Sequence, residues 1–350
     1  MSELDLSAIG YAARQLEAGE LVAFPTETVY GLGADAENPA AVAKIYAAKG
    51  RPSNHPVIVH LAPGADIGYW TTEVPEQAHR LIDAFWPGPL TLILKRAAHI
   101  PDAVSGGQDS VGLRCPSHPV AQALLRQFKG GKGGIAAPSA NKFGHVSPTT
   151  AQHVRDEFGS NEDQAEVGPL ACVLDGGQSD VGIESTIVDL TRMSTHGPVL
   201  LRPGHISASD IAHVIGIEPK QPDAAAPRAS GTLEAHYAPS TPVALVLSKV
   251  LADTVVNLSA HGKSVSLICH SAFDAANLKA TLRLPATPDG YAHDLYAAMR
   301  SADTVHADII LVEAPPVEQA WQGVNDRLRR AAHDSSGILS RLLNGTDRTN

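Results

Sequence analysis

The 350-residue sequence is poor in the features that mark secreted, membrane-embedded or polyanion-binding proteins. Its three cysteines, Cys115, Cys172 and Cys269, lie far apart and form no CxxC pair, so we expect neither disulfides nor a thiolate zinc site. No apolar run reaches the ~18 residues that span a bilayer, and the acidic N-terminus lacks the order of a signal peptide. The formal net charge of −10 disfavours non-specific binding to RNA or to anionic membranes. These absences predict a cytoplasmic protein without membrane attachment or stable nucleic-acid binding.

The motifs of several large enzyme classes are absent as well. The chain contains no GxSxG, no HExxH and no GxGxxG with an acidic partner, so hydrolase, metalloprotease and dinucleotide-binding oxidoreductase functions lack their key residues. The Lys-Gly-Gly-Lys-Gly-Gly run at 129–134 lacks the terminal Lys-Ser or Lys-Thr of a Walker A loop, which favours a flexible basic loop. A content of 43% hydrophobic and 18% charged residues is ordinary for a globular α/β protein, and the length favours one large and one small domain.

Helical and strand-like segments alternate along the first part of the chain. Apolar periodicity and capping residues predict helices at 7–18, 40–49, 76–85, 119–128, 148–158 with Ser147 as its cap, and, more weakly capped, 207–215. Short apolar runs predict strands at 21–24, 57–61, 90–95, 111–114, 135–137, near Cys172, 185–190 and 199–202. This mixed order predicts an α/β fold with a twisted, partly antiparallel sheet and flanking helices.

A change in composition separates this part from the rest. Five prolines and no apolar period between residues 218 and 242 indicate a linker. Beyond it, strands are predicted at 243–247, 265–269 and 309–312, and helices at 251–261, 291–302 and 321–332. We therefore expect a catalytic domain at 4–206, a linker at 207–241 and a smaller, open α/β domain at 242–345.

Polar motifs follow several of the predicted strands. Residues 26–33 (TETVYGLG) place two hydroxyls and a carboxylate directly after a strand, where they either hold a polar ligand or satisfy the backbone of a turn, with two glycines that let the chain turn closely. Lys49 and Arg51 flank a glycine at a helix end, where two cations suit phosphate oxygens or only complement the helix dipole. His55 and His60 lack a third ligand and do not share a helix, so they form no zinc site.

Arginines end two further strands, Arg114 in SVGLRCP (110–116) and Arg202 in LLRPG (200–204), and each either binds a ligand or serves a structural role. Small hydrogen-bonding side chains occur in APSAN (137–141), SPT (147–149) and GIESTIVD (182–189). In the linker, GTLEAHYAP (231–239) holds a histidine and a tyrosine that no core explains. Cations at strand ends surrounded by hydroxyls are more typical of a site that binds a triphosphate and a small zwitterion than of a site that attacks its substrate with a covalent nucleophile.

Taken in sequence order, seven motifs resemble the threonylcarbamoyl-AMP synthase family in its longer, two-domain form, and the match spans residues 4–239. They are TETVYGLG, Lys49-Gly-Arg51-Pro with His60, SVGLRCP, APSAN with SPT, GIESTIVD, LLRPG and HYAP. The short, single-domain YrdC-like members lack the HYAP linker and the C-terminal domain. The resemblance implies a twisted α/β domain whose basic concave cavity binds ATP and L-threonine. It also implies bicarbonate as the third substrate, and Mg²⁺ that is held mainly by ATP rather than by protein ligands.

The resemblance carries residue roles with it. Around L-threonine it implies Thr28, His60, Arg114, Ala137 and Ser185. At ATP it implies Arg51, His55, Ser110, Ser139, Asn141, Ser147, Arg202 and Tyr237, with Lys49 and Arg51 as the catalytic cations. The family usually has asparagine where His55 stands, and a histidine at this position can still donate one hydrogen bond.

The implied reaction yields threonylcarbamoyl-AMP and pyrophosphate without a protein nucleophile, and the residues assign no general base. The resemblance further implies that the product passes to the tRNA threonylcarbamoyl transferase machinery, which modifies the adenosine next to the anticodon, and we expect a monomer. One alternative is an RNA-binding YrdC-like module, against which stand the net charge of −10 and the lack of a basic, aromatic-studded face. Another is a carbamoyl-transfer domain of the hydrogenase-maturation type, whose acylphosphatase and zinc-finger segments this chain lacks.

Overall fold

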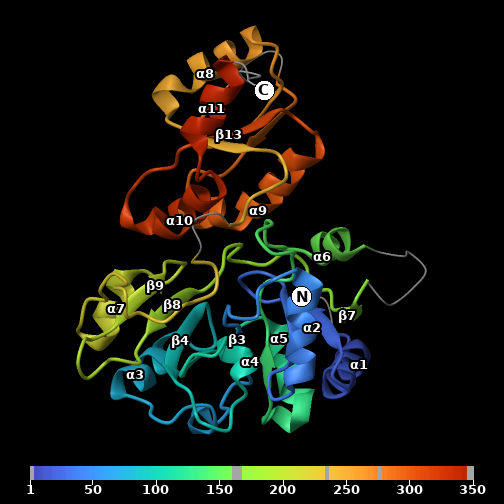
Figure 1. Cartoon of the computed structure of the whole chain (residues 1–350), viewed down its shortest axis with the longest axis vertical. Helices are drawn as coiled ribbons and strands as arrows, with labels where there is room; N and C mark the ends of the chain where they lie inside the picture. Colours follow the sequence, from blue (N-terminus) through green and yellow to red (C-terminus); the bar gives the residue numbers. More distant parts are fainter. Residues whose placement is uncertain (1–3, 160–167, 233–235, 274–277, 345–350) are drawn as a thin grey trace, which may run out of the picture. The chain divides into compact units, whose positions relative to one another are not determined.

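The computed structural model describes residues 4–159, 168–232, 236–273 and 278–344. The chain divides into two compact units, one formed by Met1–Phe143 with Ser147–Thr232 and the other by Gly144–Val146 with Leu233–Asn350 (Figure 1). In the described ranges no helix is both long and apolar enough to cross a membrane.

The first unit is built on a nine-stranded mixed sheet with the order β7-β1-β2-β6-β3-β5-β4-β8-β9. Its strands are β1 (Leu21–Phe24), β2 (Gly31–Asp35), β3 (Ile58–Leu61), β4 (Leu90–Lys95), β5 (Ser110–Arg114), β6 (Gly134–Ala136), β7 (Leu170–Val173), β8 (Thr186–Asp189) and β9 (Val199–Arg202). Its helices are α1 (Leu6–Glu17), α2 (Pro39–Lys49), α3 (Glu76–Phe85), α4 (Asp102–Ser105), α5 (Pro119–Gln127), α6 (Ala151–Phe158) and α7 (Ala208–Ile215). Parallel pairs such as β3 with β5 alternate with antiparallel pairs such as β4 with β5, which confirms the expected mixed sheet.

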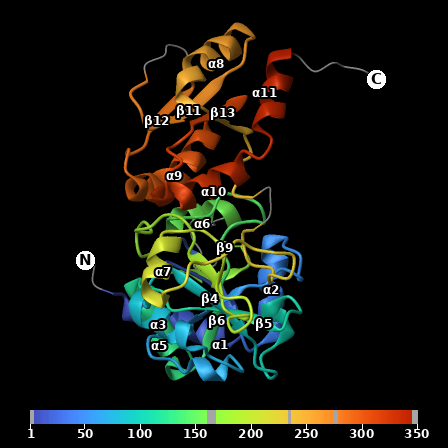
Figure 2. The same cartoon turned by 90° about the vertical axis from the view of Figure 1, so that its left-hand side faces the viewer.

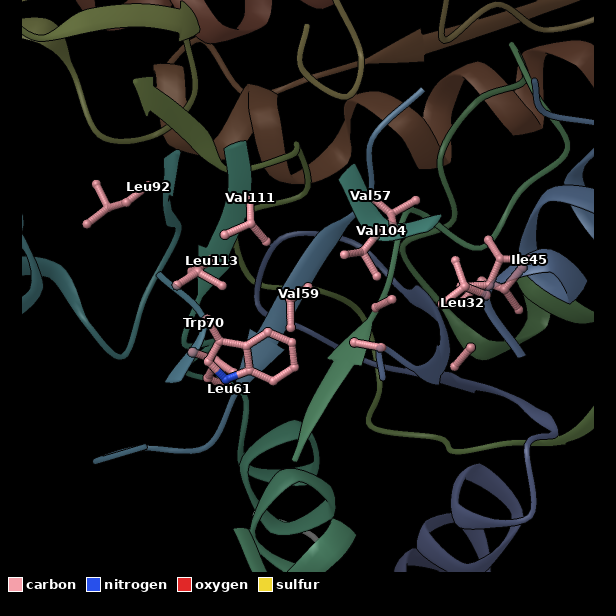
Figure 3. Packing of buried hydrophobic residues seen from close by; sticks show 14 of the residues in the cluster. Leu32, Ile45, Val57, Val59, Leu61, Trp70, Leu92, Val104, Val111 and Leu113 are labelled. Carbon is pink, nitrogen blue, oxygen red and sulfur yellow. The ribbon is translucent and has the colours of Figure 1, made fainter. Parts of the chain in front are cut away.

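The two faces of this sheet are covered differently. On one face, apolar side chains pack against α2, α3, α4, α6 and α7, and Figure 3 shows Trp70 lying beside Val59 and Leu61 in this cluster. On the other face, α1 and α5 cover only the part that carries Val22, Phe24 and Ile135. The remainder of this second face lies under the chain that follows α7, through Ala226 and Ala229. The polar site described below lies on the second face, because alternate residues of a strand point to the same side.

Four local predictions are wrong. The helix predicted from residue 148 begins at Ala151, because Thr150 is its N-cap and its Oγ1 accepts from His153 N at 3.2 Å. Ser147 and Thr150 offer the same capping chemistry, so the sequence could not choose between them. The helix judged weakly capped, α7, has a complete capping box from Ser207 and Asp210.

The third error concerns glycine. The glycines of residues 26–33 do not form a turn but lie in strand β2, paired with β1 and β6. A Cβ on Gly33 would lie 2.9 Å from side-chain atoms of both Ile135 and Phe24, so close packing rather than a turn requires glycine there.

The basic run at 129–134 is also not a free loop. The Lys129 amine bonds to Asp35 at 2.8 Å and to Glu37 at 3.0 Å, and the run ends at the start of β6.

The second unit holds a four-stranded, all-parallel sheet with the order β10-β13-β11-β12. The strands are β10 (Val243–Val246), β11 (Val265–Cys269), β12 (Ala280–Arg283) and β13 (Ile309–Glu313), and the helices are α8 (Ser248–Ala260), α9 (Pro288–Thr304), α10 (Gln322–Ala331) and α11 (Ser335–Asn344). Figure 2 shows α8 and α11 on one side of this sheet and α9 and α10 on the other. This is the expected small α/β fold. The sequence reading missed α11 and β12, and β12 is an edge strand without a fully buried residue.

Candidate active site

Two neighbouring strands bring the first predicted residues together. In the parallel pair of β3 and β5, His60 lies directly beside Arg114, and Ile58 beside Gly112. Ser110 and Arg114 occupy alternate positions of β5, so they share the face on which His60 lies. Pairing of the strands therefore assembles residues that are about fifty positions apart in sequence, which no local pattern reveals.

Arg114 is held by a buried polar group at the end of β5. Its Nη2 lies 2.7 Å from Glu27 Oε1, and both side chains are 5% exposed. Its Nη1 donates to Thr28 Oγ1 at 2.9 Å, and its Nε donates to the carbonyl oxygen of Gly88 at 3.3 Å. The Oγ1 atoms of Thr26 and Thr28 are 2.9 Å apart. The hydroxyls of residues 26–33 thus serve a side-chain network and the local backbone at once.

His60 is buried beside this group, and its ring meets Phe24 edge-on at a centroid distance of 6.0 Å. Burial, followed by the neighbouring charge of Arg114, lowers the pKa of His60 to about 3, so the ring is neutral near pH 7. Its Nδ1 is buried and makes no hydrogen bond to any described residue. Buried ring nitrogens are rarely left unpaired, so this atom suits a hydrogen bond from a small ligand.

Two arginines from distant parts of the first unit converge on Ser230. Arg202 Nη1 donates to the Ser230 carbonyl oxygen at 2.9 Å, and both terminal nitrogens of Arg51 lie 3.4 Å from Ser230 Oγ. Arg202 also donates to Ser185, through Nε to its carbonyl oxygen at 3.0 Å and through Nη2 to its Oγ at 3.1 Å. Ser185 Oγ lies 2.8 Å from Thr91 Oγ1. Two buried guanidinium groups that contact the same residue make a strong potential site for phosphate oxygens.

Lys49 lies at the end of α2 and is 3% exposed. Its Nζ donates to the carbonyl oxygens of Ser139 and Asn141, each at 2.5 Å. Burial, followed by the charge of Arg51, lowers the pKa of Lys49 well below its ordinary value. The Lys49 amine is therefore buried and fixed against the loop that follows β6, and is not a solvated group at a helix end.

The remaining predicted residues lie around these groups. Ser147 Oγ donates to Glu184 Oε1 at 2.5 Å, and both side chains are buried. The His55 ring packs edge-on against Phe143 at 5.5 Å, and burial followed by the Arg51 charge lowers its pKa. Ser110 and Ala137 are buried on β5 and just after β6.

Tyr237 belongs to the second unit. It is a non-glycine residue with a left-handed φ of 62°. Its ring packs against His236 at 4.1 Å and Tyr296 at 5.9 Å, and the Arg327 guanidinium lies 5.4 Å from its centroid. The aromatic residue that stands out in the linker sequence thus has a defined packing environment in its own unit.

The structure gives roles to residues that are not among the predicted site residues. Glu27, the carboxylate of TETVYGLG, contacts Arg114, and Glu184 in GIESTIVD accepts a hydrogen bond from Ser147. Ser230 comes directly before the GTLEAHYAP motif, so only its position one residue outside that motif hid it. Thr91 and Gly88 carry no sequence signal, since each acts by standing next to a residue that is distant in the chain.

Comparison with known proteins identifies the class of protein that carries this fold and site. The Sua5/YciO/YrdC family model, described as telomere recombination, matches residues 14–204, and a model described as threonylcarbamoyl-AMP synthase, C-terminal domain, matches residues 206–333. The chain belongs to the threonylcarbamoyl-AMP synthase family in its two-domain form.

Individual relatives resemble the chain over almost its whole length. It is 38% identical to the threonylcarbamoyl-AMP synthase of Pyrococcus abyssi, covering 93% of this chain and 94% of the relative. It is also 38% identical to that of Bacillus subtilis, covering 93% and 92%. A solved structure of P. abyssi Sua5 complexed with L-threonine matches with a TM-score of 0.86 at 36% identity, covering 95% of this chain and 96% of that one. The family resemblance read from the motifs is confirmed.

Proposed function

We propose that this protein is an L-threonylcarbamoyladenylate synthase, a nucleotidyltransferase that converts L-threonine, bicarbonate and ATP into threonylcarbamoyl-AMP and pyrophosphate. Family membership over both units supports this. The observation that carries the proposal is the division of the polar face into two parts. One part holds a buried arginine with hydroxyls and a neutral histidine, and the other holds two arginines that meet at Ser230. The first suits an amino acid, and the second suits a triphosphate.

For L-threonine we propose Thr28, His60, Arg114, Ala137 and Ser185. For ATP we propose Arg51, His55, Ser110, Ser139, Asn141, Ser147 and Arg202, with Lys49 and Arg51 as the catalytic cations. The assignment of Tyr237 to ATP is a prediction that rests on the family resemblance alone. The division into domains at 4–206 and 242–345 with a linker at 207–241 remains a prediction from the change in composition.

The chemistry needs positioning more than it needs a protein nucleophile. The neutral amine of threonine attacks the carbon of bicarbonate or of CO₂, and a C–N bond forms. With bicarbonate the elements of water leave, and with CO₂ the amine nitrogen releases a proton. An oxygen of the resulting carbamate then attacks the α-phosphorus of ATP, and the P–O bond to pyrophosphate breaks. Arg51, Arg202 and Lys49 would offset the negative charge that develops on the phosphate oxygens, and buried cations act strongly because little water screens them.

Mg²⁺ would arrive with the nucleotide. Among the described residues no group of three or more histidine, cysteine, aspartate or glutamate side chains could hold a metal ion. Magnesium commonly keeps several waters and binds substrate phosphates with few protein ligands. We therefore propose that the triphosphate supplies most of its ligands.

Binding of ATP should require a rearrangement near Ser230. In this structure Ser230 already accepts hydrogen bonds from both arginines, through its carbonyl oxygen from Arg202 and through its Oγ from Arg51. A triphosphate that uses Arg51 and Arg202 would have to replace Ser230 as their partner. Beyond this reaction, we propose a cytoplasmic monomer whose product passes to the tRNA threonylcarbamoyl transferase machinery.

The direct test is incubation of the full chain with ATP, bicarbonate and L-threonine, followed by measurement of pyrophosphate and mass detection of the adenylate. We expect product that depends on all three substrates, and loss of product in Arg114→Gln. A folded wild-type chain that releases no threonine-dependent pyrophosphate would refute the proposal. Retention on tRNA that ATP and threonine do not displace would point to the RNA-binding alternative instead.

A further inference from the structure

We propose that Glu27 determines amino-acid specificity: it positions Arg114 and cancels its charge, so that the threonine site prefers a zwitterion over a simple carboxylate. This inference rests on the proposed function, whose threonine residues include Arg114 but not Glu27. Three observations carry it, namely the geometry of the pair, its burial and the charge of its surroundings.

The geometry fixes the Arg114 guanidinium through two hydrogen bonds and one ion pair. Nη1 donates to Thr28 Oγ1 and Nε to the Gly88 carbonyl oxygen, while Nη2 lies 2.7 Å from Glu27 Oε1. Glu27 is itself anchored on both sides. Its Oε2 accepts from Ser117 N at 3.1 Å, and its carbonyl oxygen accepts from Val181 N at 2.7 Å. A carboxylate fixed in this way can hold a partner in place rather than follow it.

Because the pair is buried, its net charge acts strongly on a ligand bound beside it. Both side chains are 5% exposed, so solvent screens neither of them effectively. Removing one member of a buried pair leaves the other as an uncompensated charge, which is far more costly than at the surface. With Glu27 present, the net charge of the pair is zero. Without it, the same site would carry one positive charge.

The titratable groups nearest to the Glu27–Arg114 pair do not change this sum, while Arg202, which donates to Ser185 Oγ at 3.1 Å, is a cation of the proposed phosphate part. Burial lowers the pKa of His60 and that of His118, so neither ring carries charge near pH 7. Burial raises the pKa of the Cys115 thiol to about 11, which keeps it neutral as well. Among the residues proposed for threonine, Arg114 is the only cation, and Glu27 neutralises it.

A neutral site selects ligands of zero net charge. L-Threonine is such a ligand, since its carboxylate and its ammonium balance each other. (R)-β-hydroxybutyrate keeps the carboxylate and the hydroxyl of threonine but lacks the amine, so its binding would bury an unbalanced negative charge. The Glu27→Gln variant keeps a side chain of similar size while it removes the compensating charge. It should therefore shift the preference of the site from the zwitterion toward the anion.

The experiment measures dissociation constants of L-threonine and of (R)-β-hydroxybutyrate by calorimetry on the full chain, without ATP. In the wild type we expect the hydroxy acid to bind at least ~10-fold more weakly than threonine, the size of one charge-assisted interaction. In Glu27→Gln we expect this ratio to fall by ~10-fold or more, with KM for ATP unchanged. Glu73→Gln is the matched control, because Glu73 pairs with Lys95 at 3.0 Å on the exposed surface.

Two results would overturn the inference. One is an unchanged ratio in Glu27→Gln, with both ligands weakened equally or not at all, which would mean that Glu27 at most supports the local structure. The other needs no variant and so covers the case in which Glu27→Gln does not fold: a wild-type chain that binds the hydroxy acid as tightly as threonine. A folded wild type that binds no threonine would instead refute the proposed function itself, and this inference with it.

Discussion

The buried, neutral state of His60 predicts that the first unit is destabilised by mild acid, and the size of the effect follows from linkage. The pKa of His60 is about 3 in the folded chain, against an ordinary value of 6.5. The unfolded chain therefore binds a proton at His60 as the pH falls below about 6.5, while the folded chain does not. The contribution of His60 to stability is complete above the unfolded value and is lost as the pH falls toward the folded one. Between pH 7 and pH 5 the loss is about 2 kcal/mol.

The assay is urea unfolding at pH 7 and pH 5, followed by tryptophan fluorescence. Trp70 and Trp86 belong to the first unit, and a Trp321→Phe background removes the tryptophan of the second unit. His60→Asn should lose about 2 kcal/mol less than the parent between the two pH values, because other titrating groups contribute equally to both. His79→Asn, on the exposed side of α3, is the control and should keep the full loss. An identical loss in His60→Asn and its parent would refute the reasoning.

Three further predictions concern substitutions elsewhere in the first unit. Thr150→Ala should lower the free energy of unfolding, measured in urea, by about 1 kcal/mol because α6 loses its cap. Ser147→Ala should leave the stability of α6 unchanged and should raise KM for ATP in steady-state kinetics. The reverse pattern would contradict the assignment of Thr150 as the cap. Ser230→Asp would place a carboxylate beside Arg51 and Arg202, where it would compete with the phosphates of ATP, so KM for ATP should rise by ~10-fold or more. Ser230→Ala should change KM for ATP little. Equal effects of the two variants would argue against this competition. Lys49→Met should leave two carbonyl oxygens unpaired and cost about 1–3 kcal/mol for each, and an unfolding free energy equal to that of wild type would show that they find other partners.

Much of the fold was predictable because its signals are local. Residues 21–24, 90–95 and 199–202 read as strands from apolar runs alone, and each is a strand with these bounds. The helix predicted at 40–49 is α2, which begins one residue earlier at Pro39 and ends at Lys49. Strand β2 was missed for a reason that is not local: glycines that suggest a turn are required by Phe24 and Ile135, which reach Gly33 only once the sheet has formed.

The candidate site was predictable as a set of motifs but not as an arrangement. The sequence presents Thr28 and Arg114 as separate polar positions, and only the assembled sheet puts the hydroxyl of one 2.9 Å from the guanidinium of the other. The roles of Glu27 and Ser230 depend on which arginine each one contacts, and the sequence alone does not show these contacts. Contacts of this kind are set by strand order, and a sequence pattern does not encode strand order directly.

Buried guanidinium groups occur in two kinds of contact in the first unit. Arg114 lies 2.7 Å from the carboxylate of Glu27, whereas Arg51 and Arg202 contact the neutral oxygens of Ser230. A hydrogen bond to a neutral oxygen is weaker than one to an anion, so phosphate oxygens can replace the Ser230 contacts. A chain with a net charge of −10 can in this way hold the proposed local site for a triphosphate. The proposed division into an amino-acid part and a phosphate part therefore depends on what each arginine contacts as well as on how many arginines there are.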